Sequence, residues 1–407
     1  MIDIALVRTD PDLVRRTVAA KGSDVDVERL IAADSEMRAA QSRMEDLRAR
    51  QKKLGPADIA VAREIKEQLQ AASEQVHNLT VERNDLWERV PNLVAEDTPP
   101  GDDDSGNVEL RQVGTRPAPD PRRAHDLIGQ ELRIFDMKRG AEVAGSGFYY
   151  WRGDGARLAW ATFMYTQELL VGRGFEPMIT PLMARERTFF GTGYLPFFAD
   201  QLYRIEGTDL SMIGTSEQTL IGYYGDTIVD LAELPIRVTG FTPCFRTEAG
   251  AAGRSNRGGY RVHQFHKVEQ IVICEPEQSP QLMDECQRNC EDVLAGLELP
   301  YRVVRVCLGD LGAPAYKKYD TETWFPSFDG YRETHSNSDL TDYQARRFKI
   351  RYKKDGRTVF PHTISATAIT DRAVLAMLEN HLQPDGTIYV PKALRRYLGD
   401  QEFLGKK

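Results

Sequence analysis

Cysteine is scarce in this chain of 407 residues, which has five, and none of them forms a Cys-x-x-Cys pair. An odd number without that spacing argues against both a disulfide framework and a zinc ribbon. Cys286 and Cys290 are one helical turn apart, which fits either half of a metal site or two small buried residues on one helix face. We favour the second interpretation, since free cysteine behaves as a small buried residue.

Long apolar runs are also absent. No run approaches the length that spans a membrane, and the N-terminus MIDIALVRTDPDL lacks the basic start, apolar middle and cleavage site of a signal peptide. We therefore predict a cytoplasmic protein. The formal net charge of −8 argues against bulk attraction to nucleic acid but permits a local basic path. The length predicts two or three domains with ample core.

Two heptad repeats dominate residues 1–95. Gly55 and Pro56 separate them, and Pro91 ends the second. The rows are Leu30, Met37 and Met44 with Ala33, Ala40, Leu47 and Leu54, then Ile65, Ala72, Leu79 and Leu86 with Leu69, Val76 and Val90, a row interrupted by Arg83. Two such helices joined by a Gly-Pro turn predict an antiparallel coiled-coil hairpin. A generic packing or dimerisation pair of helices has the same pattern.

Proline, glycine and aspartate are dense over residues 96–122, which predicts a linker between the helical hairpin and a larger domain over residues 123–407. In that domain, residues 124–174 are predicted to be mostly helical. A glycine-rich break falls at Gly145–Gly147, and a helix follows over residues 156–171. The basic run from Gln344 to Arg351 is predicted to be a solvated amphipathic strand.

Residues 241–273 predict a β-hairpin with a long loop, because alternating apolar residues flank a stretch rich in small residues. Period-2 alternation sends its polar and aromatic members to one face: Arg246, Glu248, Arg261, His263, Phe265, Lys267 and Glu269. One such strand fits a solvated, salt-bridged sheet. Two facing strands of this density, with Arg254 and Arg257 in the loop, favour a polyanion site with an aromatic plate.

The run FRTEAG…RVHQF.KVE in this hairpin resembles motif 2 of the class II aminoacyl-tRNA synthetases, in its seryl-tRNA synthetase version. The resemblance extends over nearly the whole chain, to the closing YVPKALRRYLG. It implies an α+β fold, with an N-terminal antiparallel α-helical coiled-coil arm before an antiparallel β-sheet catalytic domain flanked by helices. The implied enzyme is a homodimer that activates L-serine with ATP and Mg²⁺ and transfers it to tRNA-Ser, without a DNA or membrane partner.

The resemblance assigns ATP to one set of residues and names two of them, Arg246 and Arg372, as catalytic. Arg246 would meet the α-phosphate and the substrate carboxylate, and Arg372 would meet the γ-phosphate. Glu333 and Ser336 would hold the magnesium ion. The full ATP set is Arg246, Glu248, Val262, Phe265, Glu333, Ser336 and Arg372. Without the resemblance, Arg246 and Glu248 fit a cross-strand salt bridge, Phe265 fits the core and Glu333 fits a surface charge.

The resemblance also assigns serine to a second set: Thr215, Glu217, Arg246, Glu269, Ser365 and Thr367. Glu217 would accept from the α-ammonium group and Glu269 from the side-chain hydroxyl. The alternatives are a helix-capping role for Thr215 with Glu217, and a Lys267 or Arg261 partner for Glu269. The segment HTISATAITDRAVLAMLENH resembles motif 3, a strand passing into a buried helix, but it has no glycine and has Ser365 where Asn is common.

Two further segments follow the family pattern. GFEPMITPLM, which includes Pro181, resembles motif 1, which builds the homodimer interface. The hairpin matches the arm that grips tRNA, although its LGPAD tip is short, and its first helix would contact phosphates through six cations: Arg38, Arg43, Arg48, Arg50, Lys52 and Lys53.

The short arm and the altered segment from Ser365 to Arg372 leave a second function open. It is a paralogue that activates serine or another small amino acid for a specialised biosynthetic pathway. A catalytically dead homologue is disfavoured, because Arg246, Glu248, Glu333 and Arg372 are all present.

Overall fold

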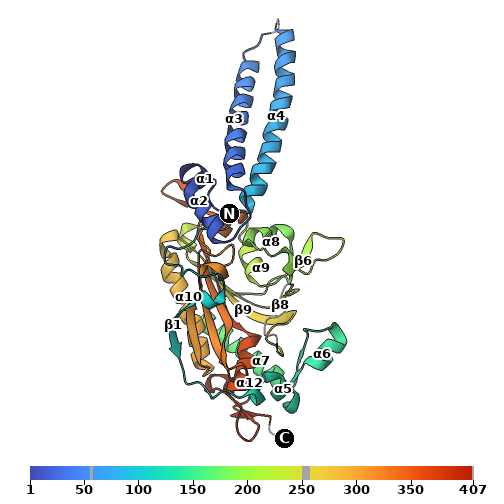
Figure 1. Cartoon of the computed structure of the whole chain (residues 1–407), viewed down its shortest axis with the longest axis vertical. Helices are drawn as coiled ribbons and strands as arrows, with labels where there is room; N and C mark the ends of the chain where they lie inside the picture. The colour runs from blue at the N-terminus through green and yellow to red at the C-terminus, as the bar shows by residue number, and fades with distance from the viewer. Residues whose placement is uncertain (56–57, 250–256, 406–407) are drawn as a thin grey trace. The chain divides into compact units, whose positions relative to one another are not determined.

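The structure is a computed structural model, and it describes residues 1–55, 58–249 and 257–405 (Figure 1). The chain forms two compact units, Met1–Leu93 and Val94–Lys407. In the described part of the chain, no helix has both the length and the hydropathy that crossing a bilayer requires.

The N-terminal unit consists of α1 (Ile4–Thr9), α2 (Pro11–Ala20), α3 (Val27–Gln51) and α4 (Ile59–Glu88). The helices α3 and α4 lie side by side as a long hairpin (Figure 1). Their facing sides bury many of the predicted heptad residues: Leu30, Ala33, Ala40, Met44, Leu47, Ile65, Ala72 and Leu86. The coiled-coil hairpin is therefore confirmed.

A buried carboxylate joins three helices of this unit. Asp34 of α3 is 1% exposed. Arg8 of α1 donates a forked pair of hydrogen bonds to it, with Nε 2.7 Å and a terminal nitrogen 2.8 Å from its two oxygens. Arg38 and Arg83 lie 3.2 and 3.8 Å from the same carboxylate. Burial raises the pKa of Asp34, but the three arginines outweigh it and leave the pKa below its usual value.

The second unit is built on an eight-stranded sheet in the order β1-β10-β11-β12-β15-β9-β8-β4. All neighbours are antiparallel except β4 and β8. The strands are β1 (Val108–Val113), β10 (Tyr301–Arg305), β11 (Lys317–Phe325), β12 (Gly330–Asp339), β15 (His362–Thr370), β9 (Gln264–Cys274), β8 (Ile236–Phe245) and β4 (Glu176–Met178).

Eight helices are described in this unit: α5 (His125–Leu132), α6 (Met137–Ala144), α7 (Asp154–Gly172), α8 (Glu186–Thr192), α9 (Glu217–Gly222), α10 (Ser279–Gly296), α11 (Tyr343–Phe348) and α12 (Asp371–Asn380). Short strands make smaller sheets: β2 (Phe135–Asp136), β3 (Tyr150–Trp151), β5 (Met183–Arg185), β6 (Leu210–Met212), β7 (Ile228–Val229), β13 (Arg351–Lys354), β14 (Arg357–Val359), β16 (Ile388–Tyr389) and β17 (Phe403–Leu404). The predicted α+β class is thus confirmed.

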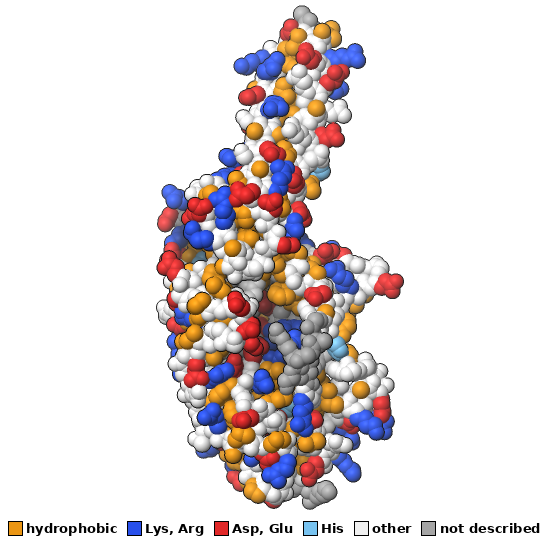
Figure 2. Space-filling view, in the orientation of Figure 1, with side chains coloured by type: hydrophobic (Ala, Val, Ile, Leu, Met, Phe, Trp, Pro, Cys, Tyr) orange, Lys and Arg blue, Asp and Glu red, His pale blue; other side chains and the backbone are white. Residues whose placement is uncertain are grey.

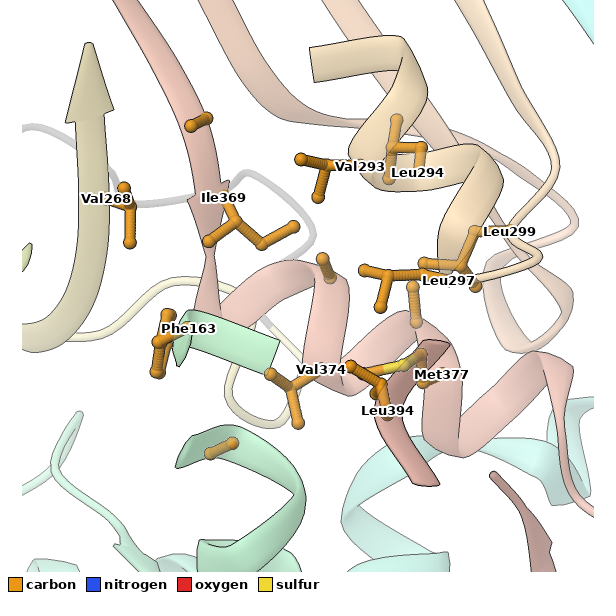
Figure 3. Close-up of a cluster of buried hydrophobic side chains, with 14 of the residues drawn as sticks. Phe163, Val268, Val293, Leu294, Leu297, Leu299, Ile369, Val374, Met377 and Leu394 are labelled. Carbon is orange, nitrogen blue, oxygen red and sulfur yellow. The ribbon is translucent and has the colours of Figure 1, made fainter. Parts of the chain in front are cut away.

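The main core lies where α7, α10 and α12 pack on strands β9 and β15. Phe163 of α7, Leu294 of α10 and Val374 of α12 meet Val268 and Ile369 of the two strands (Figure 3). All are at most 2% exposed, and burying each such side chain stabilises the fold by about 1.5–3 kcal/mol. The core therefore fixes the junction between β15 and α12.

The range predicted as a linker, residues 96–122, contains strand β1, which pairs with β10 at the edge of the large sheet. Every residue of β1 is exposed. Its apolar residues Val108, Leu110 and Val113 are exposed, and the flanking residues rich in proline, glycine and aspartate concealed the short strand in the sequence.

The run from Gln344 to Arg351 was predicted as a solvated strand, and this is wrong. Residues Tyr343–Phe348 form the helix α11, and the next strand, β13, begins only at Arg351. The Arg347 guanidinium is buried because the carbonyl groups of Phe190 and Leu195 accept its hydrogen bonds at 2.9 and 3.1 Å. The charge of this run suggested a surface segment, but internal carbonyl groups accept the hydrogen bonds of Arg347 and allow its burial.

Candidate active site

The pair β8 and β9 forms the predicted hairpin, with Phe241 opposite Val268 and Phe245 opposite Gln264. Polar residues were predicted on both strands, but Arg246, Glu248, Arg261 and His263 lie just beyond the strand ends. Only Phe265, Lys267 and Glu269 are in a strand. The pairing nevertheless continues, since the Arg246 N–H donates to the His263 carbonyl at 3.0 Å.

Glu248 and Arg261 face each other across the hairpin. Glu248 has a left-handed backbone with φ of 52°, and the Arg261 side chain donates to its carboxylate. The salt-bridge interpretation therefore describes Glu248, but its partner is Arg261 rather than Arg246.

A cavity of about 220 Å³ opens at this end of the sheet. It includes every residue of the predicted ATP set: Arg246, Glu248, Val262, Phe265, Glu333, Ser336 and Arg372. The Arg246 guanidinium lies 5.3 Å from the centre of the Phe265 ring, and its Nε donates to the Gly214 carbonyl at 3.3 Å. A guanidinium and an aromatic ring in one cavity suit a nucleotide, which has both phosphates and a planar base.

Arg372 enters the same cavity from the start of α12. Its Nε donates to the Tyr260 carbonyl at 3.1 Å, and its guanidinium lies 4.4 Å from the centre of the Tyr260 ring. A terminal nitrogen donates to the Glu333 carbonyl at 2.9 Å and lies 3.4 Å from the Glu333 carboxylate. These contacts hold a second cation opposite Arg246, where the far end of a polyphosphate would bind.

Glu333 and Ser336 lie on β12 and face this cavity. Desolvation raises the pKa of Glu333, but the charges of Arg372, Lys318 and Arg246 outweigh it and lower the pKa overall. The group is thus ionised at neutral pH. In the described residues, no cluster of three His, Cys, Asp or Glu side chains could hold a metal on its own. Two oxygen donors beside phosphate-binding cations nevertheless fit Mg²⁺, which takes most of its ligands from phosphates and water.

A second cavity of about 440 Å³ shares five lining residues with the first: Arg246, Glu248, Arg261, Lys267 and Ser336. Glu269 of β9 is 2% exposed and lines this cavity. Thr215 Oγ1 donates to Glu269 Oε2 at 2.8 Å, and the Lys267 ammonium pairs with the same oxygen. The Lys267 pairing considered from the sequence is therefore present in this pocket.

Glu217 begins α9 and lines the second cavity. Burial raises its pKa, as does the nearby Glu269 charge, whereas Lys267 lowers it. Its backbone N–H donates to Thr215 Oγ1 at 3.2 Å, but the N-cap of α9 is Ser216 and makes no side-chain capping bond, so Thr215 forms a local turn before the helix rather than its cap. An ammonium group bound here would favour the ionised carboxylate.

Ser365 and Thr367 are buried neighbours on β15 but line different cavities. Ser365 faces the cavity that contains Glu217 and Glu269, whereas Thr367 faces the cavity that contains Phe265 and Arg372. Thr367 is paired in register with Glu269.

The structure adds Gln344, which the sequence did not predict as a site residue. Its Nε2 donates to Glu217 Oε1 at 2.7 Å and to the Thr192 carbonyl at 3.0 Å. Its own Oε1 accepts from Thr363 Oγ1 at 2.7 Å. No signal in the sequence separated this buried glutamine from its basic neighbours.

Asp371 is a second residue near the site that the sequence did not predict. Its carboxylate accepts from the Tyr149 hydroxyl and from Trp151 Nε1, each at 2.8 Å, and from the backbone N–H of His266. The residue directly precedes Arg372, so this network fixes the start of α12. Its position at the strand-to-helix junction was the only signal in the sequence.

The six cations predicted to bind tRNA belong to the N-terminal unit. Lys and Arg side chains are interspersed with Asp and Glu along the hairpin (Figure 2). Arg38 is paired with Asp34, and the others are exposed: Arg43, Arg48, Arg50, Lys52 and Lys53.

A dominantly antiparallel sheet, with an arginine at a strand-to-helix junction beside a cavity lined by cations and an aromatic ring, is the architecture of a class II aminoacyl-tRNA synthetase. The family model "tRNA synthetase class II core domain (G, H, P, S and T)" matches residues 202–381, and "Seryl-tRNA synthetase N-terminal domain" matches residues 1–94. A serine–tRNA ligase from Rubrobacter xylanophilus is 40% identical over 100% of this chain and 99% of its own length. The chain belongs to the serine–tRNA ligase family.

Two solved structures agree with that assignment. Seryl-tRNA synthetase from Pyrococcus horikoshii, complexed with ATP, has a TM-score of 0.93 and 34% identity, covering 99% of both chains. Cytoplasmic serine–tRNA ligase from Naegleria fowleri, in complex with AMP, has a TM-score of 0.91 and 31% identity, covering 99% of this chain and 98% of that chain. The family and the fold predicted from the sequence are confirmed.

Proposed function

We propose that this chain converts L-serine and ATP to seryl-adenylate and pyrophosphate, and then transfers the seryl group to tRNA-Ser. The observation that carries the proposal is the wall shared by two cavities. Arg246 and Lys267 line both the pocket with Glu217 and Glu269 and the pocket with Phe265 and Arg372. An amino acid and a nucleotide bound in the two pockets would meet at Arg246.

In the first step, a serine carboxylate oxygen attacks the α-phosphorus, and the bond to the bridging oxygen of pyrophosphate breaks. Both reactants are anions, so their approach needs cations and positioning more than covalent help. Arg246 binds the carboxylate and the α-phosphate, and Arg372 binds the γ-phosphate. Glu248 accepts from the adenine amino group, and Phe265 stacks on the ring.

Magnesium, when bound, neutralises charge on the phosphates. Glu333 and Ser336 would hold it, because they are oxygen donors that line the same cavity as Arg372. The lowered pKa of Glu333 keeps its carboxylate charged for this purpose.

Selectivity for serine rests on the buried acids of the second cavity. Glu217 accepts from the α-ammonium group, and Glu269 accepts from the side-chain hydroxyl. An alanine substrate would leave the buried Glu269 carboxylate without that donor, which costs about 1–3 kcal/mol. Ser365 and Thr367 complete the pocket with their hydroxyl groups.

In the second step, a ribose hydroxyl at the 3′ end of tRNA attacks the seryl carbonyl, and AMP leaves. The exposed cations on and after α3 would bind phosphates of the tRNA. The chain works as a homodimer in the cytoplasm. Apolar side chains exposed near the motif 1 segment support the dimer, and they are Trp160, Met164, Val171 and Ile179.

The test is ATP–pyrophosphate exchange with serine, threonine, alanine, cysteine and glycine, followed by charging of total tRNA. Serine-dependent exchange with charging of tRNA-Ser supports the proposal. Exchange without charging, or a preference for another amino acid, would instead indicate a paralogue that serves a specialised biosynthetic pathway.

A further inference from the structure

We propose that His125 is a positioning residue for ATP, because it holds the returning limb of the motif 2 hairpin, residues 258–262, in place. The inference rests on the proposed use of ATP by this site. His125 begins α5, and its side chain is 0% exposed. It lies 134 residues before Gly259, whose backbone N–H donates to His125 Nε2 at 3.0 Å.

The hydrogen bonds define the tautomer of His125. Because Nε2 accepts from an N–H group, the proton of the neutral ring is on Nδ1. Nδ1 lies 2.7 Å from Glu379 Oε1, so it donates to this carboxylate. The His125 backbone N–H donates to the same oxygen at 3.1 Å. The ring thus connects α12, through Glu379, to the Gly259 backbone.

Glu379 is held firmly enough to serve as an anchor. It is 0% exposed, and the Ser327 hydroxyl and backbone N–H donate to its two oxygens at 2.8 and 3.0 Å. A buried carboxylate that accepts several hydrogen bonds is held in one rotamer. The His125 ring is also surrounded by Phe135, Phe325 and Phe328, each centred 6.4 Å away.

The limb passes close to the ring. Gly258 has φ of +62°, and a Cβ there would lie 2.2 Å from His125 Nε2. Gly259 is equally confined, since its Cβ would lie 2.5 Å from Phe135. Only glycine allows the backbone to approach an imidazole this closely.

The next residues of the limb belong to the nucleotide cavity. The Tyr260 carbonyl accepts from Arg372 Nε, and the Tyr260 hydroxyl donates to the Glu333 carbonyl at 2.9 Å. Arg261 donates to Glu248. Two residues of α12 therefore grip adjacent residues of the limb: Arg372 contacts Tyr260 directly, and Glu379 reaches Gly259 through His125. The helix α12, which carries Arg372, thus also fixes the segment beside Glu248, the proposed acceptor for the adenine amino group.

Two substitutions separate the two hydrogen bonds of the ring. Asn places its amide nitrogen near the position of Nδ1, so His125→Asn keeps the donor to Glu379 and loses the acceptor for Gly259. Gln places its carbonyl oxygen near the position of Nε2, so His125→Gln keeps the acceptor and loses the donor. His77→Asn on the exposed face of α4 is the matched control.

The measurements are calorimetric titration with ATP alone, and the KM for ATP and for serine in pyrophosphate exchange. We expect His125→Asn to raise the ATP Kd and KM about tenfold with the serine KM within twofold of the unmodified enzyme. We expect His125→Gln to stay within threefold for both. The reverse order, with Asn unaffected and Gln impaired, would overturn the inference and make His125 only a buried partner of Glu379.

The inference would also be overturned if both variants lost exchange activity equally, with a lowered melting temperature and unchanged KM values for ATP and serine. If His125→Asn does not fold, Gly258→Ala provides the second variant, because its Cβ displaces the limb. An unchanged ATP Kd in Gly258→Ala would contradict the inference. Failure of the proposed function is distinguishable, because the unmodified enzyme would then show no serine-dependent exchange, whereas ATP titration still reports on His125.

Discussion

Gln344 donates its Nε2 to Glu217 Oε1 at 2.7 Å, while its own carbonyl accepts from Thr363, so the amide cannot turn over. The Glu217 carboxylate is therefore held in one orientation within the amino acid pocket. Gln344 itself is 0% exposed.

Gln344→Leu should raise the KM for serine about tenfold and leave the KM for ATP unchanged. A hydrogen bond to a charged group contributes about 1.5–3 kcal/mol, and 1.4 kcal/mol is a factor of ten. Pyrophosphate exchange at varied serine and ATP measures both. Gln112→Leu on the exposed strand β1 is the control, and a rise in both KM values for Gln344→Leu would contradict an effect through Glu217.

Arg246→Ala should lower the exchange rate by at least about 10³-fold, because both reacting anions lose their shared cation. Circular dichroism and the melting temperature should match those of the unmodified enzyme. Arg185→Ala, whose side chain is 72% exposed, is the matched control. Near-normal exchange in Arg246→Ala would remove this residue from the chemistry.

Glu269→Ala should reduce discrimination between serine and alanine by about 5- to 150-fold, because the lost donor costs about 1–3 kcal/mol and 1.4 kcal/mol is a factor of ten. The buried Glu269 carboxylate disfavours alanine because alanine lacks the hydroxyl donor of serine. The variant has no carboxylate at this position, so this penalty disappears. The ratio of kcat/KM for the two amino acids in exchange measures this. Selectivity that survives the substitution would place the recognition of serine elsewhere.

Asp34→Asn should destabilise the N-terminal unit by about 1.5–3 kcal/mol at pH 7, because three partly exposed arginines lose a charged partner. The folded-state pKa of Asp34 is lowered, so its stabilisation is present above the unfolded pKa of about 3.9 and is lost as pH falls through the folded pKa. Hydrogen exchange of α1 and α3 in the full chain should therefore differ between variant and parent at pH 7 and converge under strong acid. Equal exchange at pH 7 would show that the cluster contributes nothing.

Replacing Arg43, Arg48 and Arg50 with alanine should weaken tRNA charging and leave pyrophosphate exchange intact. Each lost phosphate contact should lower the slope of log affinity against log salt by about one. Filter binding of tRNA at several salt concentrations measures the slope. Unchanged binding would mean that the arm does not contact tRNA through α3.

Parts of this molecule with a regular pattern could be predicted from the sequence. The heptads of α3 and α4 identified the hairpin, and the alternation around residues 241–273 identified β8 and β9. The strand-to-helix junction at Arg372 followed from its motif. The first two segments repeat one local rule over many residues, so neighbours in sequence were enough, whereas the third rests on a resemblance to a known family.

The remainder depends on residues far apart in the sequence. Strand β1 has no buried face, and α11 buries Arg347 only because carbonyl groups from α8 and the segment after it surround the charge. Gln344 and Asp371 act through partners at least 105 residues away, such as Glu217, Thr192 and His266. No local pattern records such contacts.

The strand β9 presents Phe265, Lys267 and Glu269 at intervals of two residues on one face. At about 3.3 Å per residue, roughly 13 Å of backbone separates Phe265, the proposed stacking ring for the base, from Glu269, the proposed acceptor for the amino acid side chain. Strands β8 and β15 hydrogen-bond to β9 on both sides, so this spacing cannot stretch. Strand β9 thus fixes the distance between residues 265 and 269. Under the proposed function, an amino acid longer than serine would need a different residue at position 269, because the strand cannot lengthen.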